Sequence, residues 1–65
     1  MRIRCFQDTD TLYIELRAAQ VSETRDLDED AVIDLDGQGA VCAITVEHAS
    51  ERAEMPTFSY EQIAA

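Results

Sequence analysis

The sequence predicts a mainly β fold: a five-stranded antiparallel meander in a single domain spanning residues 1–65, ending in a short helix or an extended tail. Three observations predict it. Apolar and polar residues alternate with a period of two over residues 11–17 and 31–36, which is typical of strands with one buried face. Acidic or glycine-containing turns separate the strand-like segments. Because every connection is short, we expect sequential neighbours to pair.

The first predicted hairpin occupies residues 2–17. Its first strand, residues 2–7, is short and alternating. The Asp-Thr-Asp sequence at residues 8–10 favours a turn, because aspartate side chains bond to their own backbone. Residues 11–17 have the clearest strand pattern in the chain, with Leu12, Ile14 and Leu16 on one side and Tyr13, Glu15 and Arg17 on the other.

Three further strands follow. Residues 21–27 are largely polar, so we expect a short strand or an edge strand, where charges discourage unwanted pairing. Residues 31–36 and 40–47 form the central hairpin around a Gly-Gln-Gly turn, since glycine reaches the positive φ that tight turns need. The second strand of this hairpin is apolar on both sides, which predicts that it lies between two layers.

The C-terminal segment carries weaker signals. Ser50 is placed to cap one helical turn over residues 51–54, and Pro56 ends whatever precedes it. Ser59 and Gln62 have capping-box spacing, which allows one or two helical turns before the end of the chain. Docked on the sheet, this segment would close one side of the core through Phe58, Tyr60 and Ile63.

The length and charge of the chain predict self-association and exclude several partners. A domain of 65 residues buries only about 60% of its unfolded surface, and two cysteines provide neither a disulfide framework nor a metal cluster. Oligomerisation, with a homodimer as the commonest form, is the remaining source of stability. The net charge of −9 argues against nucleic acid or an anionic membrane as partner, although it permits a basic protein. The sequence has no signal-peptide pattern and no long apolar run, so we expect a cytoplasmic protein with reduced thiols.

Residues 5–50 resemble the family called domain of unknown function 2283. The family pattern has an acidic turn, Leu-Tyr-Ile, a Thr-containing strand, an Ile-Leu-Asp-x-Asp segment, a glycine turn, an apolar Gly-Ile-Glu-Ile-Leu strand and an Ala-Ser pair. The corresponding residues here are, in the same order, Asp8 and Asp10, Leu12-Tyr13-Ile14, Thr24, Val32-Ile33-Asp34-Leu35-Asp36, Gly39, Ile44 and Ala49-Ser50. The chain departs from the family pattern at Ala43, Thr45 and Glu47. The resemblance implies no established activity. Because some members are encoded beside small toxin-like proteins, it implies an antitoxin-like role.

The sequence offers no constellation for catalysis, a cofactor or a metal. The acidic turn at residues 26–30 matches the first three ligand positions of a calcium loop but lacks its glycine and its bidentate glutamate, so we expect a solvated turn with at most weak cation binding. His48 is the only histidine, and Cys42 lies in an apolar run without a basic neighbour. We therefore predict a protein that is not an enzyme.

A second apolar row on the sheet is the most informative surface feature. Tyr13, Val32, Val41 and Ala43 are expected opposite the face that carries Leu12, Ile14, Ile33 and Leu35, and the C-terminal Phe58 and Tyr60 either cover that row or leave it free. These six residues are the candidate interface. Two functions remain open: an acidic interaction module that homodimerises through a sheet face, and an antitoxin-like protein that neutralises a basic toxin partner.

Overall fold

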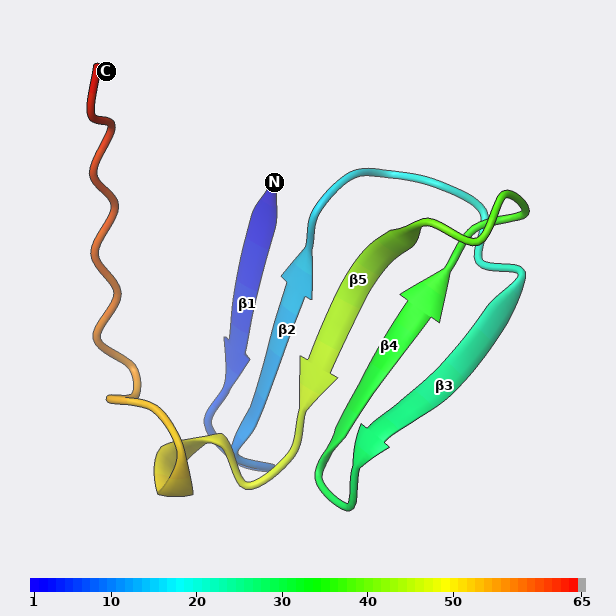
Figure 1. Ribbon diagram of the computed structural model, residues 1–65. Coiled ribbons are helices and arrows are strands. Elements are labelled where there is room, and N and C mark those ends of the chain that lie inside the picture. The colour runs from blue at the N-terminus through cyan, green and yellow to red at the C-terminus, as the bar shows by residue number, and fades with distance from the viewer. Residues whose placement is uncertain (65) are drawn as a thin grey trace.

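In the computed structural model, which describes residues 1–64, five antiparallel strands form one sheet (Figure 1). The strands are β1 (Arg2–Phe6), β2 (Thr11–Glu15), β3 (Glu23–Asp28), β4 (Ala31–Leu35) and β5 (Val41–Val46). A single turn of 3-10 helix, η1 (Ala49–Glu51), follows β5 within the described part of the chain. The predicted fold class is confirmed, and each strand begins and ends within two residues of its predicted position.

The order of the strands in the sheet differs from the predicted one. The order is β1-β2-β5-β4-β3, so β3, β4 and β5 form a meander, but β2 pairs with β5 and not with β3. The connection at residues 16–22 crosses the ends of β5 and β4 instead of making a hairpin (Figure 1). Its two ends are held by backbone hydrogen bonds: the Leu16 amide donates to the Cys42 carbonyl at 2.8 Å, and the Ser22 amide to the Leu35 carbonyl at 2.8 Å.

This order puts the most apolar strand in the middle of the sheet. β5 pairs on both sides, with β2 and β4, while the polar β3 takes an edge, as its composition predicts. In the central position the side chains of β5 are flanked on both faces by those of two neighbouring strands. The prediction that β5 lies between two layers is wrong for the described residues, which form one sheet. The short loop at residues 16–22 does not prevent this arrangement, because an extended chain of seven residues spans about 25 Å.

Two irregularities alter the predicted side-chain pattern. The register between β4 and β5 shifts near Leu35, so that Asp34 lies opposite Ala43 but Leu35 lies opposite Val41. A second shift in β3 leaves Leu27 between the paired Asp26 and Asp28, and Leu27 is 58% exposed. A bulge of this kind adds one residue to one strand and interrupts the alternation beyond it.

The C-terminal segment departs from the predicted helices. η1 begins two residues before the predicted turn, and its N-cap is His48, without a side-chain capping bond, instead of Ser50. The capping-box spacing at Ser59 and Gln62 does not produce a helix: residues 57–64 are extended, and Ala65 lies outside the described residues. In Figure 1 this segment runs beside β1, away from β5, β4 and β3. The extended tail is thus the correct one of the two predicted alternatives.

Candidate interaction surface

One face of the sheet is apolar over β1, β2, β5 and β4, whereas β3 adds the ion pair of Arg25 and Glu23 at its edge. The register places Ile3, Ile14, Ile44 and Ile33 in one row across β1, β2, β5 and β4. A second row on the same face contains Cys5, Leu12, Val46 and Ala31. Directly opposite residues in antiparallel strands point to the same side, so these eight side chains form one surface. We call it the isoleucine face.

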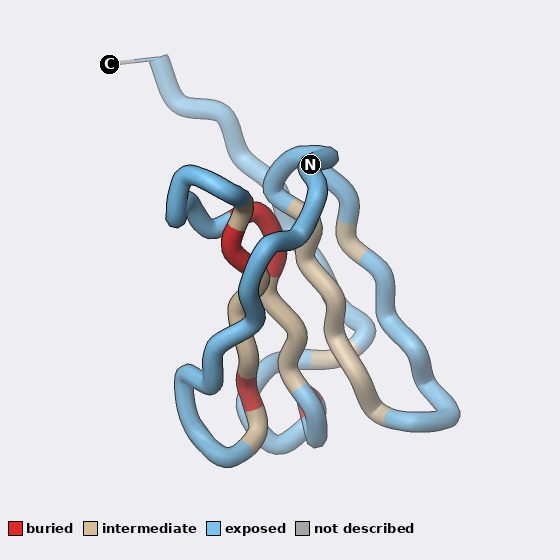
Figure 2. Tube along the Cα trace, turned by 90° about the vertical axis from the view of Figure 1, so that its right-hand side faces the viewer, coloured by how far each residue is buried: buried red, intermediate tan, exposed pale blue. Residues whose placement is uncertain are grey.

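No second layer covers the isoleucine face. Among residues 1–64, the buried apolar residues are Ala31, Leu35, Cys42, Ala43 and Ala49, and only Leu35 has a large side chain. The strands β2, β4 and β5 are mainly half-buried with short buried stretches, whereas β1 and β3 are mostly exposed (Figure 2). The Cα trace measures only 17 Å along its thinnest direction. A sheet normally buries its apolar face against another layer about 10 Å away, so this sheet lacks half of a core.

The C-terminal segment covers only the β1–β2 side of this face. A cavity of about 210 Å³ lies between the sheet residues Ile3, Leu12 and Ile14 and the segment residues Met55 and Phe58. Beyond it, an open groove of about 690 Å³ is lined by Met1, Ile3, Cys5, Phe58 and Tyr60. Neither space reaches the β4 side of the face, where Ile33 and Leu35 lie.

The six predicted interface residues do not all lie on one face of the sheet. Tyr13 and Val32 share the opposite face of the sheet, since both lie opposite Thr45. Ala43 belongs to that face by register but is only 2% exposed, and the register shift pairs Val41 with Leu35 instead. Phe58 lies against the isoleucine face, so the C-terminal segment leaves the Tyr13 row free, which is one of the two alternatives that the sequence allows. The face that the sequence assigns to the core keeps Ile33 and Ile44 only half-buried in the described chain.

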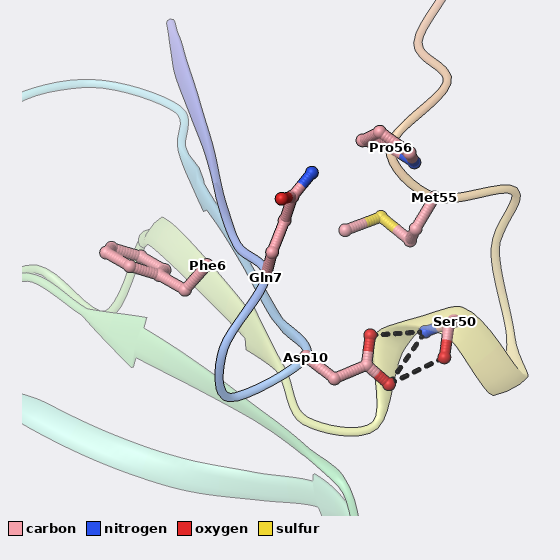
Figure 3. Close-up of a pocket in the computed structure, with 6 residues that line it drawn as sticks. All are labelled: Phe6, Gln7, Asp10, Ser50, Met55 and Pro56. Carbon is pink, nitrogen blue, oxygen red and sulfur yellow. Dashed lines mark hydrogen bonds between the residues drawn. The ribbon is translucent and has the colours of Figure 1, made fainter.

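A hydrogen-bonded clamp fixes the point where the chain leaves β5. The Asp10 carboxylate accepts hydrogen bonds from the Ser50 amide at 3.1 Å and from the Ser50 hydroxyl at 2.6 Å (Figure 3). The Asp10 carbonyl also accepts a bond from the Ala49 amide at 2.9 Å, and Ala49 is fully buried. Asp10 has a φ of 54°, a left-handed conformation that aspartate tolerates better than most residues. The clamp joins the β1–β2 turn to η1.

A model of the family described as "Protein of unknown function (DUF2283)" matches residues 2–50. The chain belongs to this family. The comparison with curated proteins found no match, and the comparison with solved structures found none either. The matched segment of the DUF2283 domain includes all five strands and ends at Ser50, the residue held by the Asp10 clamp. The extended residues 57–64 lie outside it.

Two carboxylates of the acidic turn in the DUF2283 domain contact groups of the same chain. Asp28 accepts hydrogen bonds from the Asp30 amide at 2.9 Å and from the Arg52 guanidinium at 2.6 Å. The Arg52 hydrogen bond, more than the Asp30 amide, holds the pKa of Asp28 below its ordinary value. Asp30 lies 3.1 Å from His48 Nδ1, and this contact raises the pKa of His48. Over residues 1–64, no group of three or more His, Cys, Asp or Glu side chains is arranged to hold a metal ion.

The two cysteines are separate free thiols, Cys5 exposed in β1 and Cys42 buried in β5. The Cys42 thiol lies 3.4 Å from the Asp34 carbonyl and acts as a small buried side chain beside the register shift. No helix within residues 1–64 has the length and apolar character needed to cross a membrane.

The hydrogen bonds of Asp36 in the β4–β5 turn predict how the stability of the DUF2283 domain depends on pH. The Asp36 carboxylate accepts bonds from the Ala40 and Gln38 amides and then from Arg17, and these partners lower its pKa from 3.8. A carboxyl with a lowered folded pKa stabilises the fold above its unfolded pKa, and this contribution disappears as the pH falls through the folded pKa. Urea unfolding of Asp36→Asn should therefore differ most from the unmodified chain near pH 6 and least near pH 2. A pH-independent difference would contradict the assignment.

Proposed function

We propose that the chain is a small acidic interaction module without enzymatic activity, and that it forms a homodimer by packing two isoleucine faces against each other. One observation carries the proposal: a row of four isoleucines lies on a single-layered sheet, and the described chain covers only the β1–β2 side of that row. Two such sheets packed about 10 Å apart would form a sandwich and supply the missing half of the core.

The energetics favour burial of this face. Covering a large aliphatic side chain contributes about 1.5–3 kcal/mol, and each copy offers five large aliphatic side chains in the two rows, Ile3, Ile14, Ile33, Ile44 and Leu12, together with Val46. Domains of this size commonly obtain their stability from oligomerisation. The opposite face carries charged residues, including Arg4, Asp26 and Asp34, and is suited to water.

The two free thiols fit a reducing cytoplasm, which is the compartment we propose.

A second candidate is neutralisation of a basic toxin-like protein, which the net charge of −9 favours. Within residues 1–64 the ion pairs of Arg17, Arg25 and Arg52 engage only Asp36, Glu23 and Asp28, and the chain has 14 acidic residues. Most of the negative charge is therefore available to attract a cationic partner. Added salt should weaken binding to a basic partner, whereas it should strengthen homodimerisation.

The salt dependence of association provides the test. Two copies that each carry a charge of −9 repel one another, and salt screens that repulsion. We expect sedimentation equilibrium in reducing buffer to show a dimer at micromolar concentration whose dissociation constant falls several-fold between roughly 0.05 and 0.5 M NaCl. A chain that stays monomeric at high salt and high micromolar concentration would refute the homodimer. Binding to a basic partner would instead weaken over the same salt range.

A further inference from the structure

The C-terminal residues 57–64, which we call the arm, have the features of a segment that binds an apolar surface. The segment is extended, and three of its eight side chains are large and exposed: Phe58 at 62%, Tyr60 at 76% and Ile63 at 74%. Among the described residues, its backbone makes no hydrogen bond to the sheet. An extended chain with free backbone groups and apolar side chains gains from packing against an apolar surface.

The arm is continuous with the isoleucine face. Met55, Pro56 and Phe58 line one cavity with Ile3 and Ile14, so the arm starts on that face at the β1 edge. It then runs beside β1 and leaves the β5–β4–β3 side of its own sheet uncovered (Figure 1). Phe58 and Tyr60 form only one wall of the groove whose other wall is Met1, Ile3 and Cys5.

The exposed aromatics of the arm add to the area that a dimer can bury. Five strands about 4.8 Å apart and about five residues long, at about 3.3 Å per residue, present roughly 400 Å² in projection. A stable interface of standard size buries about 800 Å² of accessible surface on each partner. Phe58 and Tyr60 are 62% and 76% exposed, and aromatic side chains bury about 150–250 Å² each. The arm therefore brings a substantial share of a standard interface to the modest area of the sheet face.

We propose that residues 57–64 cross to a second copy of the chain, where Phe58 and Tyr60 pack on the uncovered β4–β5 side of the isoleucine face, against the partner's Ile33 and the partner's Ile44. The inference rests on the proposed homodimer and specifies its geometry. The two-fold axis runs parallel to the strands, so that β1 of each copy faces β3 of the other. In the other two-fold arrangement β1 would face β1, so both arms would lie at the same edge and neither would reach the partner's β4–β5 side.

Contacts between copies can be observed directly by NMR. In a dimer mixed from ¹³C-labelled and unlabelled full-length chains, we expect intermolecular NOEs between the Tyr60 ring and the Ile33 methyl groups. If the dimer forms but the arm aromatics show NOEs only within one chain, the crossing arm is refuted while the proposed homodimer stands. If the full-length chain is monomeric at every concentration, the homodimer and the arm both fail.

Variants of the arm supply an independent measurement. Truncation after Pro56, and separately Phe58→Ser/Tyr60→Ser in the full-length chain, should raise the dimer dissociation constant by roughly 30-fold or more while a dimer still forms at higher concentration. Glu61→Gln, an exposed polar position on the same arm, is the matched control and should leave it within about two-fold. Unchanged dissociation constants in both arm variants would overturn the inference.

Discussion

Replacement of Ile33 by threonine should weaken the homodimer by roughly 100- to 1,000-fold. Ile33 lies on β4 at the end of the isoleucine row and is only half-buried within one chain. Threonine keeps the β-branched shape that suits a strand, but it removes apolar surface and adds a hydroxyl that the interface would have to desolvate. The loss is about 1.5–2 kcal/mol per site, and two-fold symmetry applies it twice.

Val32→Thr is the matched control because Val32 is the next residue on the same strand, half-buried, and on the opposite face. Sedimentation equilibrium of both variants distinguishes the two faces, and circular dichroism at the same concentration verifies that each variant keeps its sheet. We expect Val32→Thr to change the dissociation constant by less than about three-fold. A large effect of Val32→Thr with a small effect of Ile33→Thr would instead identify the face that carries Tyr13 as the interface.

The positions of the strands could be predicted from the sequence, and their order could not. Alternation over residues 11–17 and 31–36 is a local property that fixes where a strand lies and which side chains share a side. The partner of β2 depends on a choice between β3 and β5 that loop length does not decide. The composition of β5, apolar on both sides, carries the relevant signal, because the side chains of a central strand are flanked on both faces by those of two neighbouring strands.

The sequence alone also does not show that the isoleucine face is the uncovered one. The sequence pattern placed Ile14 and Ile33 in a core and treated the Tyr13 row as the candidate contact surface. Within residues 1–64, however, the segment after η1 covers the isoleucine face at the β1 edge and does not reach Ile33. The register shift that pairs Val41 with Leu35 cannot be recognised in the sequence. A bulge interrupts the alternation of apolar and polar residues, and β5 shows no such alternation because it is apolar on both sides.

The Asp10–Ser50 clamp joins residues that are 40 positions apart in the sequence. The local sequence predicts a turn at Asp10, which is correct, and a helix cap at Ser50, which is wrong because His48 is the N-cap and the Ser50 hydroxyl donates to Asp10. The resemblance to the family included both residues but gave no reason for either. Their hydrogen bonds supply that reason: the clamp closes the end of the sheet where β2 begins and β5 ends.

Asp10→Ala should lower the free energy of unfolding by about 2–3 kcal/mol, because it removes a charged acceptor from two donors and puts alanine at a positive φ. For a domain of this length the corresponding fall in Tm is roughly 10–20 °C. Urea unfolding should be measured at one fixed protein concentration, since dimerisation contributes to apparent stability. Asp8→Ala, at an exposed position in the same turn, should stay within about 0.5 kcal/mol.

A double-mutant cycle determines whether the loss comes from the clamp itself. Ser50→Ala removes only the hydroxyl donor, so it should cost about 1 kcal/mol, and it should cost much less when Asp10 is already alanine. Additive losses would show that Asp10 acts through the turn conformation alone. The clamp also sets where Met55 and Pro56 lie, because these residues share a cavity with Asp10 and Ser50 (Figure 3). Asp10→Ala should therefore misplace the start of the arm and weaken the dimer as well as the fold.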